Sequence, residues 1–221
     1  MVVAGLELGL SLIWLLSSLQ GRATIQDLAE ATPSNVFEHG HVWTLATSPF
    51  LEKSFIGLLL HCVVLWMFVP TLERFWGTAR FYRFFAITSL VGTIAGCAFG
   101  LLIGADQPIG GLNPFIYASI VAFGIVYARQ PVQFFGVLPL TGRQLMYGFI
   151  GFLILFVVLQ QFWQLGAAFA AAMVTAALMT SKRWSPGLMW RRWKIARARA
   201  KLSVIDGGKP ARPRDEKKWL N

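Results

Sequence analysis

Six apolar stretches, each about as long as a bilayer is thick, follow one another along this chain. They lie at about 1–20, 54–72, 84–104, 111–128, 145–162 and 164–181. A transmembrane α-helix needs about 20 predominantly apolar residues. The hydrocarbon core offers no water to backbone polar groups, so segments of this kind cross it as helices. The sequence therefore predicts an all-α membrane protein built as a bundle of six transmembrane helices.

The composition supports one membrane unit. Of 221 residues, 56% are hydrophobic and 14% are charged, which is far more apolar than a soluble domain requires. We expect a transmembrane domain over 1–181 and a basic tail over 182–221. The first stretch lacks a basic leader, carries Glu7 and has no small-residue cleavage site, so we interpret it as a retained helix rather than a signal peptide. Cys62 and Cys97 lie inside apolar stretches and indicate reduced packing residues, with no disulfide framework.

Basic residues indicate the orientation in the membrane. The connection after the second stretch carries Arg74, Arg80 and Arg83, the one after the fourth carries Arg129 and Arg143, and the tail holds most of the others. The alternate loops are poor in Lys and Arg. Because cytoplasmic loops carry the excess of positive charge, we expect both termini in the cytoplasm. The expected location is a bacterial cytoplasmic membrane, with the lipid bilayer as the first partner.

The tail explains most of the net charge of +10. Its stretch MWRRWKIARARAKL, 189–202, is amphipathic and basic, and its membrane-surface candidates are Trp190, Arg191, Arg192, Trp193 and Lys194. Interfacial tryptophans beside cations suit a helix lying on anionic lipid headgroups. Nucleic-acid binding is the alternative for an arginine-rich segment. We expect no nucleic-acid partner, because the orientation rule already accounts for this charge.

Glycines recur every fourth residue in the third stretch. Gly92, Gly96, Gly100 and Gly104 share one helical face, and small residues let helix backbones approach closely in lipid. The face indicates packing against another helix of the same chain. Homo-oligomerisation through the same face is the alternative.

Residues 41–66, HVWTLATSPFLEKSFIGLLLHCVVLW, resemble the pattern of the rhomboid intramembrane serine proteases. That pattern runs W-R-L-x-T-x-x-F-L-H, then H-x-x-x-N, then Trp. The matching residues, in register without a gap, are Trp43, Leu45, Thr47, Phe50, Leu51 and Trp66. LERFWGTARF, 72–81, looks like the family's motif after its second helix. The resemblance implies a rhomboid-like fold.

The resemblance continues at the positions where the family carries its catalytic groups. GGLNPFIYA falls where the family has G-x-S-G and then a Tyr, and Gly111 and Tyr117 fit that spacing. In the sixth stretch, Ala171 and Thr175 occupy the family's small positions after its catalytic His. The similarity extends over about 41–181.

The departures from the family fall on its chemistry. The serine nucleophile is replaced by Asn113 and the histidine base by Ala168, while Gly57 and His61 replace the H-x-x-x-N pair. A serine protease needs an activated hydroxyl, a base and oxyanion donors. Asn has no ionisable hydroxyl and Ala cannot accept a proton. The sequence therefore predicts a pseudoprotease rather than an enzyme, with no catalytic residues and no cofactor.

Asn113 and Pro114 together are typical of a helix start. Asn is a preferred N-cap and Pro is favoured at the next position, so we interpret Asn113 as a cap of the fourth helix. Contact of its side chain with a client backbone is the functional alternative. For His61, in mid-span, we favour an interhelical hydrogen bond over client contact. The candidate client-binding residues are Asn113, Tyr117, His61 and Trp43.

A histidine pair and a buried-or-interfacial glutamate are two further features of the sequence. His39 and His41 form H-x-H in the first loop, but no third ligand is placed, so we expect no metal site. Glu7 faces either the bundle or the interface, and the sequence leaves both open.

What the resemblance implies is binding of transmembrane client proteins, in trafficking, quality control or regulation. An intramembrane serine protease with unconventional groups is the first alternative, for which Ser119 and His61 are the only conceivable pair. A small-solute transporter is the second, and it would need more mid-span charges than Glu7 provides.

Overall fold

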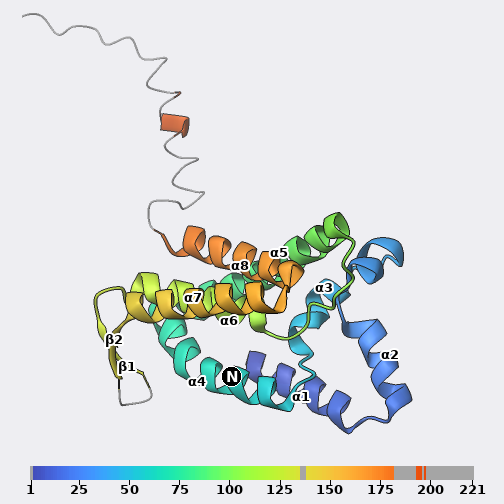
Figure 1. Cartoon of the computed structure of the whole chain (residues 1–221). Coiled ribbons are helices and arrows are strands. Elements are labelled where there is room, and N and C mark those ends of the chain that lie inside the picture. The colour runs from blue at the N-terminus through green and yellow to red at the C-terminus, as the bar shows by residue number, and fades with distance from the viewer. Residues whose placement is uncertain (1, 135–137, 182–192, 196, 198–221) are drawn as a thin grey trace, which may run out of the picture. The chain divides into compact units, whose positions relative to one another are not determined.

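The computed structural model describes residues 2–134, 138–181, 193–195 and 197. The chain forms two compact units, Met1–Lys182 and Arg183–Asn221. The first unit is a bundle of helices whose order along the chain can be followed by colour in Figure 1. In the second unit, residues 193–195 and 197 are helical. Trp190, Arg191 and Arg192 of the predicted surface helix lie outside the described residues.

The first unit contains helices of very different length. In chain order its elements are α1 (Val2–Leu16), α2 (Leu19–Ala29), η1 (Ser34–Glu38), α3 (Thr44–Thr47), η2 (Ser48–Phe50), α4 (Phe55–Trp76), α5 (Thr78–Ile103), α6 (Asn113–Val126), β1 (Pro131–Phe134), β2 (Leu138–Thr141), α7 (Gly142–Gln160) and α8 (Trp163–Thr180).

Each predicted membrane stretch contains a helix, but only some of these helices are long enough to cross. Within the described residues, α4, α5, α7 and α8 are long and apolar enough to span a bilayer, whereas α1 and α6 are shorter apolar helices. The 14 residues of α6 extend about 21 Å, against a hydrocarbon core of about 30 Å. All six predicted stretches are therefore helical, and four of them have the length and composition of a membrane span. A count of six spans is not confirmed.

The first helix stops four residues before the predicted boundary. Ser18 caps the start of α2, where its hydroxyl accepts a hydrogen bond from the N–H of Gly21. The guanidinium of Arg22 turns back and donates to the terminal carbonyls of α1, with Nη2 2.6 Å from the oxygen of Leu15. A serine cap and a basic side chain at a helix C-terminus both stabilise the break.

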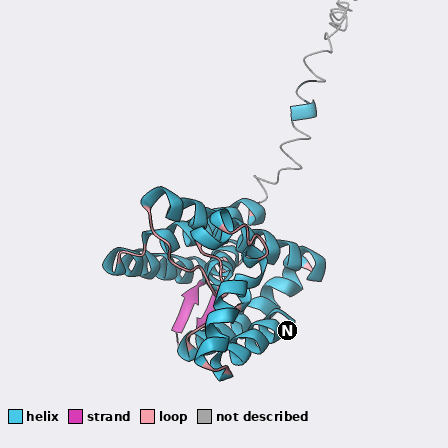
Figure 2. Ribbon diagram, turned by 90° about the vertical axis from the view of Figure 1, so that its right-hand side faces the viewer, coloured by secondary structure: helices cyan, strands magenta, loops and turns pink. Residues whose placement is uncertain are grey.

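A small β-hairpin follows α6 and corrects the all-α expectation. β1 and β2 pair antiparallel, with Pro131 opposite Thr141, and Figure 2 shows the two strands beside the helices. Pro131 and Pro139 disfavour a continuous helix through this connection, because proline lacks the N–H that an interior helical position needs. Two-stranded edges tolerate such prolines.

The centre of the bundle is α6, which contacts α4, α5, α7 and α8. Ten of its 14 residues are buried, so protein rather than lipid surrounds it. Phe115 forms the middle of an aromatic cluster, with ring centroids 5.9 Å from Phe81 and 4.9 Å from Phe85. A helix enclosed by others does not need to match the bilayer thickness, which explains how α6 remains short.

The glycine face of α5 packs within the chain. A Cβ added to Gly96 would lie 2.7 Å from the methyl of Ala168 in α8, and one added to Gly92 would lie 2.8 Å from Pro114. Gly100 would meet Pro33 at 2.7 Å. The packing prediction is confirmed for these three. It is wrong for Gly104, which has open space around it and ends α5 in the left-handed conformation at φ 66°, a regular role for glycine.

Two of the arginine-rich connections lie at the same end of the bundle. The ring of Phe75, at the end of α4, lies 6.2 Å from that of Tyr127, at the end of α6. At the same end Val3 of α1 shares an apolar groove with Val69 and Pro70 of α4. The predicted orientation needs such clustering, and the side of the membrane on which this end lies stays a prediction.

Candidate functional site

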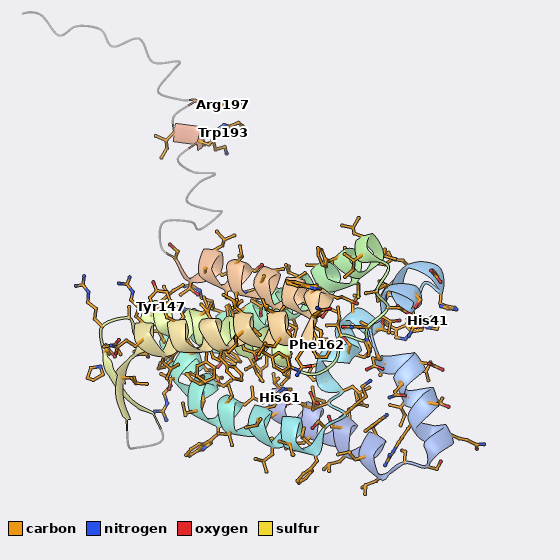
Figure 3. All side chains as sticks on the ribbon, in the orientation of Figure 1. His41, His61, Tyr147, Phe162, Trp193 and Arg197 are labelled. Atoms are coloured by element: carbon orange, nitrogen blue, oxygen red, sulfur yellow. The ribbon has the colours of Figure 1, made fainter. Side chains whose placement is uncertain are left out.

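A histidine between two polar side chains lies at the centre of the candidate site. His61 lies six residues into α4 and is only 5% exposed. Its Nδ1 is 2.6 Å from Oε1 of Glu7 in α1, and its Nε2 is 3.0 Å from Oδ1 of Asn113 in α6. In Figure 3, His61 lies on the side of α4 that faces the bundle. The predicted interhelical hydrogen bond is confirmed, and Glu7 is fully buried in the bundle.

Asn113 does not cap α6, so that prediction is wrong. Leu112 is the residue before the helix, and Asn113 is already its first helical residue, with no side-chain capping bond. A capping residue keeps an extended backbone and turns its side chain toward the helix N–H groups. Asn113 has entered the helix, and its amide points outward instead. Its Oδ1 faces His61, and its Nδ2 donates to the carbonyl of Gly110 at 3.5 Å.

A second carboxylate, from Glu52, fills the space between two glycines. A Cβ added to Gly57 would lie 2.8 Å from Oε1 of Glu52, and one added to Gly111 would collide with Oε2. Oε1 accepts a hydrogen bond from the N–H of Ser54 at 3.0 Å, and Oε2 lies 3.8 Å from Nδ1 of His61. The two glycines therefore create the room in which a carboxylate lies beside the imidazole.

Sequence reasoning missed Glu52, although a signal for it exists. Glu52 directly follows Phe50 and Leu51, at the position where the rhomboid pattern has the histidine of F-L-H. Gly57 stands where the pattern has the histidine of H-x-x-x-N. The two departures are coupled in space, because the carboxylate of one lies where a side chain of the other would be. Comparing the departures as a set would have pointed to this carboxylate.

Backbone hydrogen bonds hold the glycine turn before α6. The N–H of Ile109 donates to the carbonyl of Ala31 at 2.9 Å, and the N–H of Gly111 donates to that of Ser48 at 2.9 Å. Gly111 has φ 72°, a conformation that glycine adopts at no steric cost. On the other side, Ser11 of α1 accepts from the N–H of Glu52 at 2.9 Å. Separate segments thus fix the position of Asn113 relative to His61.

A cavity of about 330 Å³ adjoins these polar groups. Its charged lining includes Glu30 and Lys53, an ion pair with 2.6 Å between Nζ and Oε1. Tyr117 also lines it, with its ring 5.0 Å from that of Phe169. The full lining is Glu30, Leu51, Glu52, Lys53, Pro108, Gly110, Asn113, Tyr117, Phe156, Phe162, Leu165 and Phe169. The cavity therefore combines an aromatic wall with polar groups at the start of a short central helix.

The remaining predicted residues lie elsewhere. Trp43 is 51% exposed on the turn directly before α3, where its Nε1 donates to the carbonyl of Leu28 and its ring lies 4.6 Å from that of His41. It does not line the cavity. Ala168 is fully buried, with its methyl against Gly96. The structure thus brings together Asn113, Tyr117 and His61, and it leaves Trp43 apart.

The chemistry available at the site is limited by these contacts. Both ring nitrogens of His61 are engaged, and in the described part of the chain no serine or threonine hydroxyl is hydrogen-bonded to either of them. The hydroxyl of Ser119, the candidate nucleophile of the protease alternative, is buried without a hydrogen-bond partner among the described residues. Within the same residues no group of three potential metal ligands occurs.

Comparison with known proteins places the chain in a family. The family described as "Eukaryotic integral membrane protein (DUF1751)" matches residues 2–184, most of the chain. The chain belongs to this family. A part of the chain is also similar to the "Putative rhomboid protease YdcA" of Bacillus subtilis (strain 168), with 28% identity over 129 residues. That match covers 58% of this chain and 58% of the relative, so the chain spans less than two thirds of the relative's length.

Together these matches support a rhomboid-like integral membrane protein, in agreement with the resemblance in the sequence. The two matches do not agree on whether the protein is bacterial, as the expected location requires. The family is described as eukaryotic, whereas the matched relative is bacterial. An integral membrane protein is shown, and a bacterial cytoplasmic membrane with cytoplasmic termini stays a prediction.

Proposed function

We propose that this protein is a non-catalytic, rhomboid-like membrane protein that binds transmembrane segments of client proteins. The observation that carries the proposal is the cavity at the start of α6. There the residue in the family's nucleophile position, Asn113, is an amide held by a hydrogen bond to His61.

The depth of the cavity favours a client from the membrane. His61 lies about 9 Å along the axis of α4 from its start, at 1.5 Å per residue, and α6 begins beside it. Polar groups at such depth tend to be functional, because leaving them unused in hydrocarbon is expensive. A client segment with unpaired backbone groups would gain hydrogen bonds there that lipid cannot provide.

The size of the cavity favours a short part of a client. A helix with its side chains is about 10–12 Å across, whereas the cavity measures about 330 Å³. It can hold a few side chains or a locally unwound stretch. The wall formed by Phe156, Phe162 and Phe169 offers apolar contact for these side chains, and Asn113 offers hydrogen bonds to the backbone.

Absence of catalysis is part of the proposal. Ala168 supplies no base, and the Nε2 of His61 faces the amide of Asn113 rather than a hydroxyl. A protease with unconventional groups is the second candidate, because Glu7 and His61 resemble the pairing of an orienting carboxylate with a base. Among the described residues, however, no serine or threonine hydroxyl is hydrogen-bonded to this pair.

Site-specific crosslinking tests the proposal. A photoreactive amino acid replaces Phe156, which lines the cavity, and in the matched control it replaces the neighbouring Leu155, which is exposed and outside the lining. After irradiation in native membranes, we expect membrane proteins crosslinked from position 156 and absent from position 155. Identical products from the two positions, or lipid adducts alone, would refute client binding in this cavity.

A further inference from the structure

The hydrogen bonds around His61 define where its protons are. The carbonyl oxygen of the Asn113 amide faces Nε2 at 3.0 Å. A carbonyl oxygen only accepts, so Nε2 carries a proton in this arrangement. On the other side, 2.6 Å separates Nδ1 from Oε1 of Glu7, and this bond needs one proton as well. The pair therefore holds two protons and has no net charge, either as imidazolium with carboxylate or as imidazole with carboxylic acid.

This pair is shielded from water. Glu7 is fully buried and His61 is 5% exposed, and Oε2 of Glu7 has no hydrogen-bond partner among the described residues. The titratable and charged groups around the pair are Glu52, with Oε2 3.8 Å from Nδ1, Cys62 next to His61 in α4, and Glu30, Lys53 and Tyr117 around the adjoining cavity.

We propose that Glu7 and His61 form a buried proton-binding site. Whether the proton is bound decides whether Asn113 offers the cavity a hydrogen-bond donor or an acceptor. Removing one proton leaves a carboxylate and a neutral imidazole with a single N–H. That N–H stays on Nδ1, where it donates to the charged Glu7, the stronger acceptor. Nε2 then becomes an acceptor that faces the carbonyl oxygen of Asn113 across 3.0 Å.

Two acceptors 3.0 Å apart repel more strongly than two acceptors 3.5 Å apart, so the amide of Asn113 rotates and offers Nδ2 to His61. Its carbonyl oxygen then turns toward the carbonyl of Gly110, the group that Nδ2 meets now. Because that carbonyl cannot donate, the oxygen of Asn113 needs a donor from the cavity, which it lines. With the proton bound, Asn113 offers the cavity an N–H, and with the proton lost it offers an acceptor. The consequence for client binding rests on the proposed function.

Nitrogen NMR on the full chain in liposomes tests the proton site itself. Asparagines and histidines carry ¹⁵N, with His39→Gln and His41→Gln so that only His61 reports on an imidazole. The titration covers about pH 5 to pH 9, which brackets the ordinary histidine pKa of about 6.5. We expect Nε2 to pass from protonated to unprotonated while Nδ1 keeps its proton, and the Asn113 amide signal, assigned by its loss in Asn113→Ala, to shift in the same step. An Nε2 that stays protonated, or an amide signal that does not follow it, would overturn the proposal.

Glu7→Gln provides the matched variant. Its amide can donate to Nδ1, which keeps the neutral imidazole protonated at Nε2 and bonded to Asn113 as now. In this variant we expect Nε2 to stay protonated as the pH rises, and the Asn113 amide signal not to shift. A variant that retains the step of the parent would show that Glu7 is not part of the proton site. If Glu7→Gln does not fold, the titration of the parent decides alone.

Crosslinking from position 156 at the two ends of the titration separates the proton site from the proposed function. The yield should change about threefold to tenfold, the effect of one hydrogen bond, and should not change in Glu7→Gln. A pH step in the NMR signals without any captured client would leave the proton site standing and refute client binding. Capture with a yield that ignores pH, in the absence of an NMR step, would refute the proton site alone.

Discussion

At the level of single residues, Glu52, Gly57 and Gly111 depend on one another. The carboxylate reaches His61 only because neither glycine has a Cβ that would meet it. The sequence predicts His61 as a partner in an interhelical bond, but it does not predict Glu7 or Glu52 as neighbours. Those contacts depend on how α1 and the segment before α4 fold over α4, which no local pattern encodes. The N-cap interpretation of Asn113 fails for a similar reason, since its partner comes from another helix.

Gly111→Ala should destabilise the protein through both its backbone and its neighbour. At φ 72° an alanine costs about 1–2 kcal/mol, and its Cβ would also displace Glu52. Gly40→Ala is the matched control, because Gly40 has φ 70° and nothing within 4 Å. Unfolding free energies in detergent should fall further for Gly111→Ala than for Gly40→Ala, and Glu52→Ala should restore part of the difference. Equal losses would mean that Glu52 does not fill this space.

Restoring the two lost catalytic groups should not create a good protease. Asn113→Ser with Ala168→His supplies a hydroxyl and an imidazole, but Ala168 is fully buried against Gly96 and leaves the ring little room. The Gly57 position also lacks a side-chain donor, and loss of one oxyanion donor costs about 10²–10³ in rate. We expect neither the parent nor the double variant to cleave a rhomboid-type transmembrane substrate in liposomes. Cleavage by the parent that disappears on changing His61 or Ser119 would favour the protease alternative.

At the level of elements, hydropathy and the glycine spacing predict most of the bundle. The helix positions and the α5 face at Gly92, Gly96 and Gly100 follow from patterns that lie within a single helix. The length of α6 does not, because it depends on enclosure by four neighbours. The break between α1 and α2 depends on capping by Ser18, inside a stretch for which hydropathy predicts one span. The hairpin depends on Pro131 and Pro139, inside a connection for which hydropathy predicts a loop.

Gly96→Leu should separate α5 from α8. A leucine there would push against Ala168 and Ile109, both within 3.0 Å of the added Cβ, and overpacking costs about 1–3 kcal/mol. The matched control is Gly151→Leu, since Gly151 in α7 has nothing within 4 Å. Thermal unfolding in detergent should show a loss for the first variant and little change for the second. A parent-like melting curve for Gly96→Leu would contradict the assigned packing.

At the level of the whole molecule, the distribution of basic residues predicts the orientation of the protein in the membrane. The arginine-rich end of the bundle and the basic tail are the features from which a cytoplasmic orientation is predicted. In the tail, the guanidinium of Arg197 lies 3.6 Å from the ring centre of Trp193, one helical turn away, a cation–π arrangement. The two side chains thus lie on the same side of their helical turn.

A peptide of residues 184–204 should bind anionic vesicles more tightly than neutral ones. Each cation near a charged surface contributes about 1 kcal/mol, and the interfacial tryptophans add to both. Partitioning is measured by tryptophan fluorescence at low and high salt, and the preference for anionic lipid should weaken as salt screens the charges. Equal partitioning into the two compositions would contradict the membrane-surface assignment.

The most direct measurement of the central claim is the mass of a client captured from the cavity. Position 156 carries the photoreactive group, membranes are irradiated, and the crosslinked partner is analysed as an intact protein. A non-catalytic binding site predicts a partner of full length, with the crosslink within its transmembrane segment, in the parent and in His61→Gln alike. A partner recovered as fragments cut within its transmembrane segment by the parent, and whole from His61→Gln, would contradict the account.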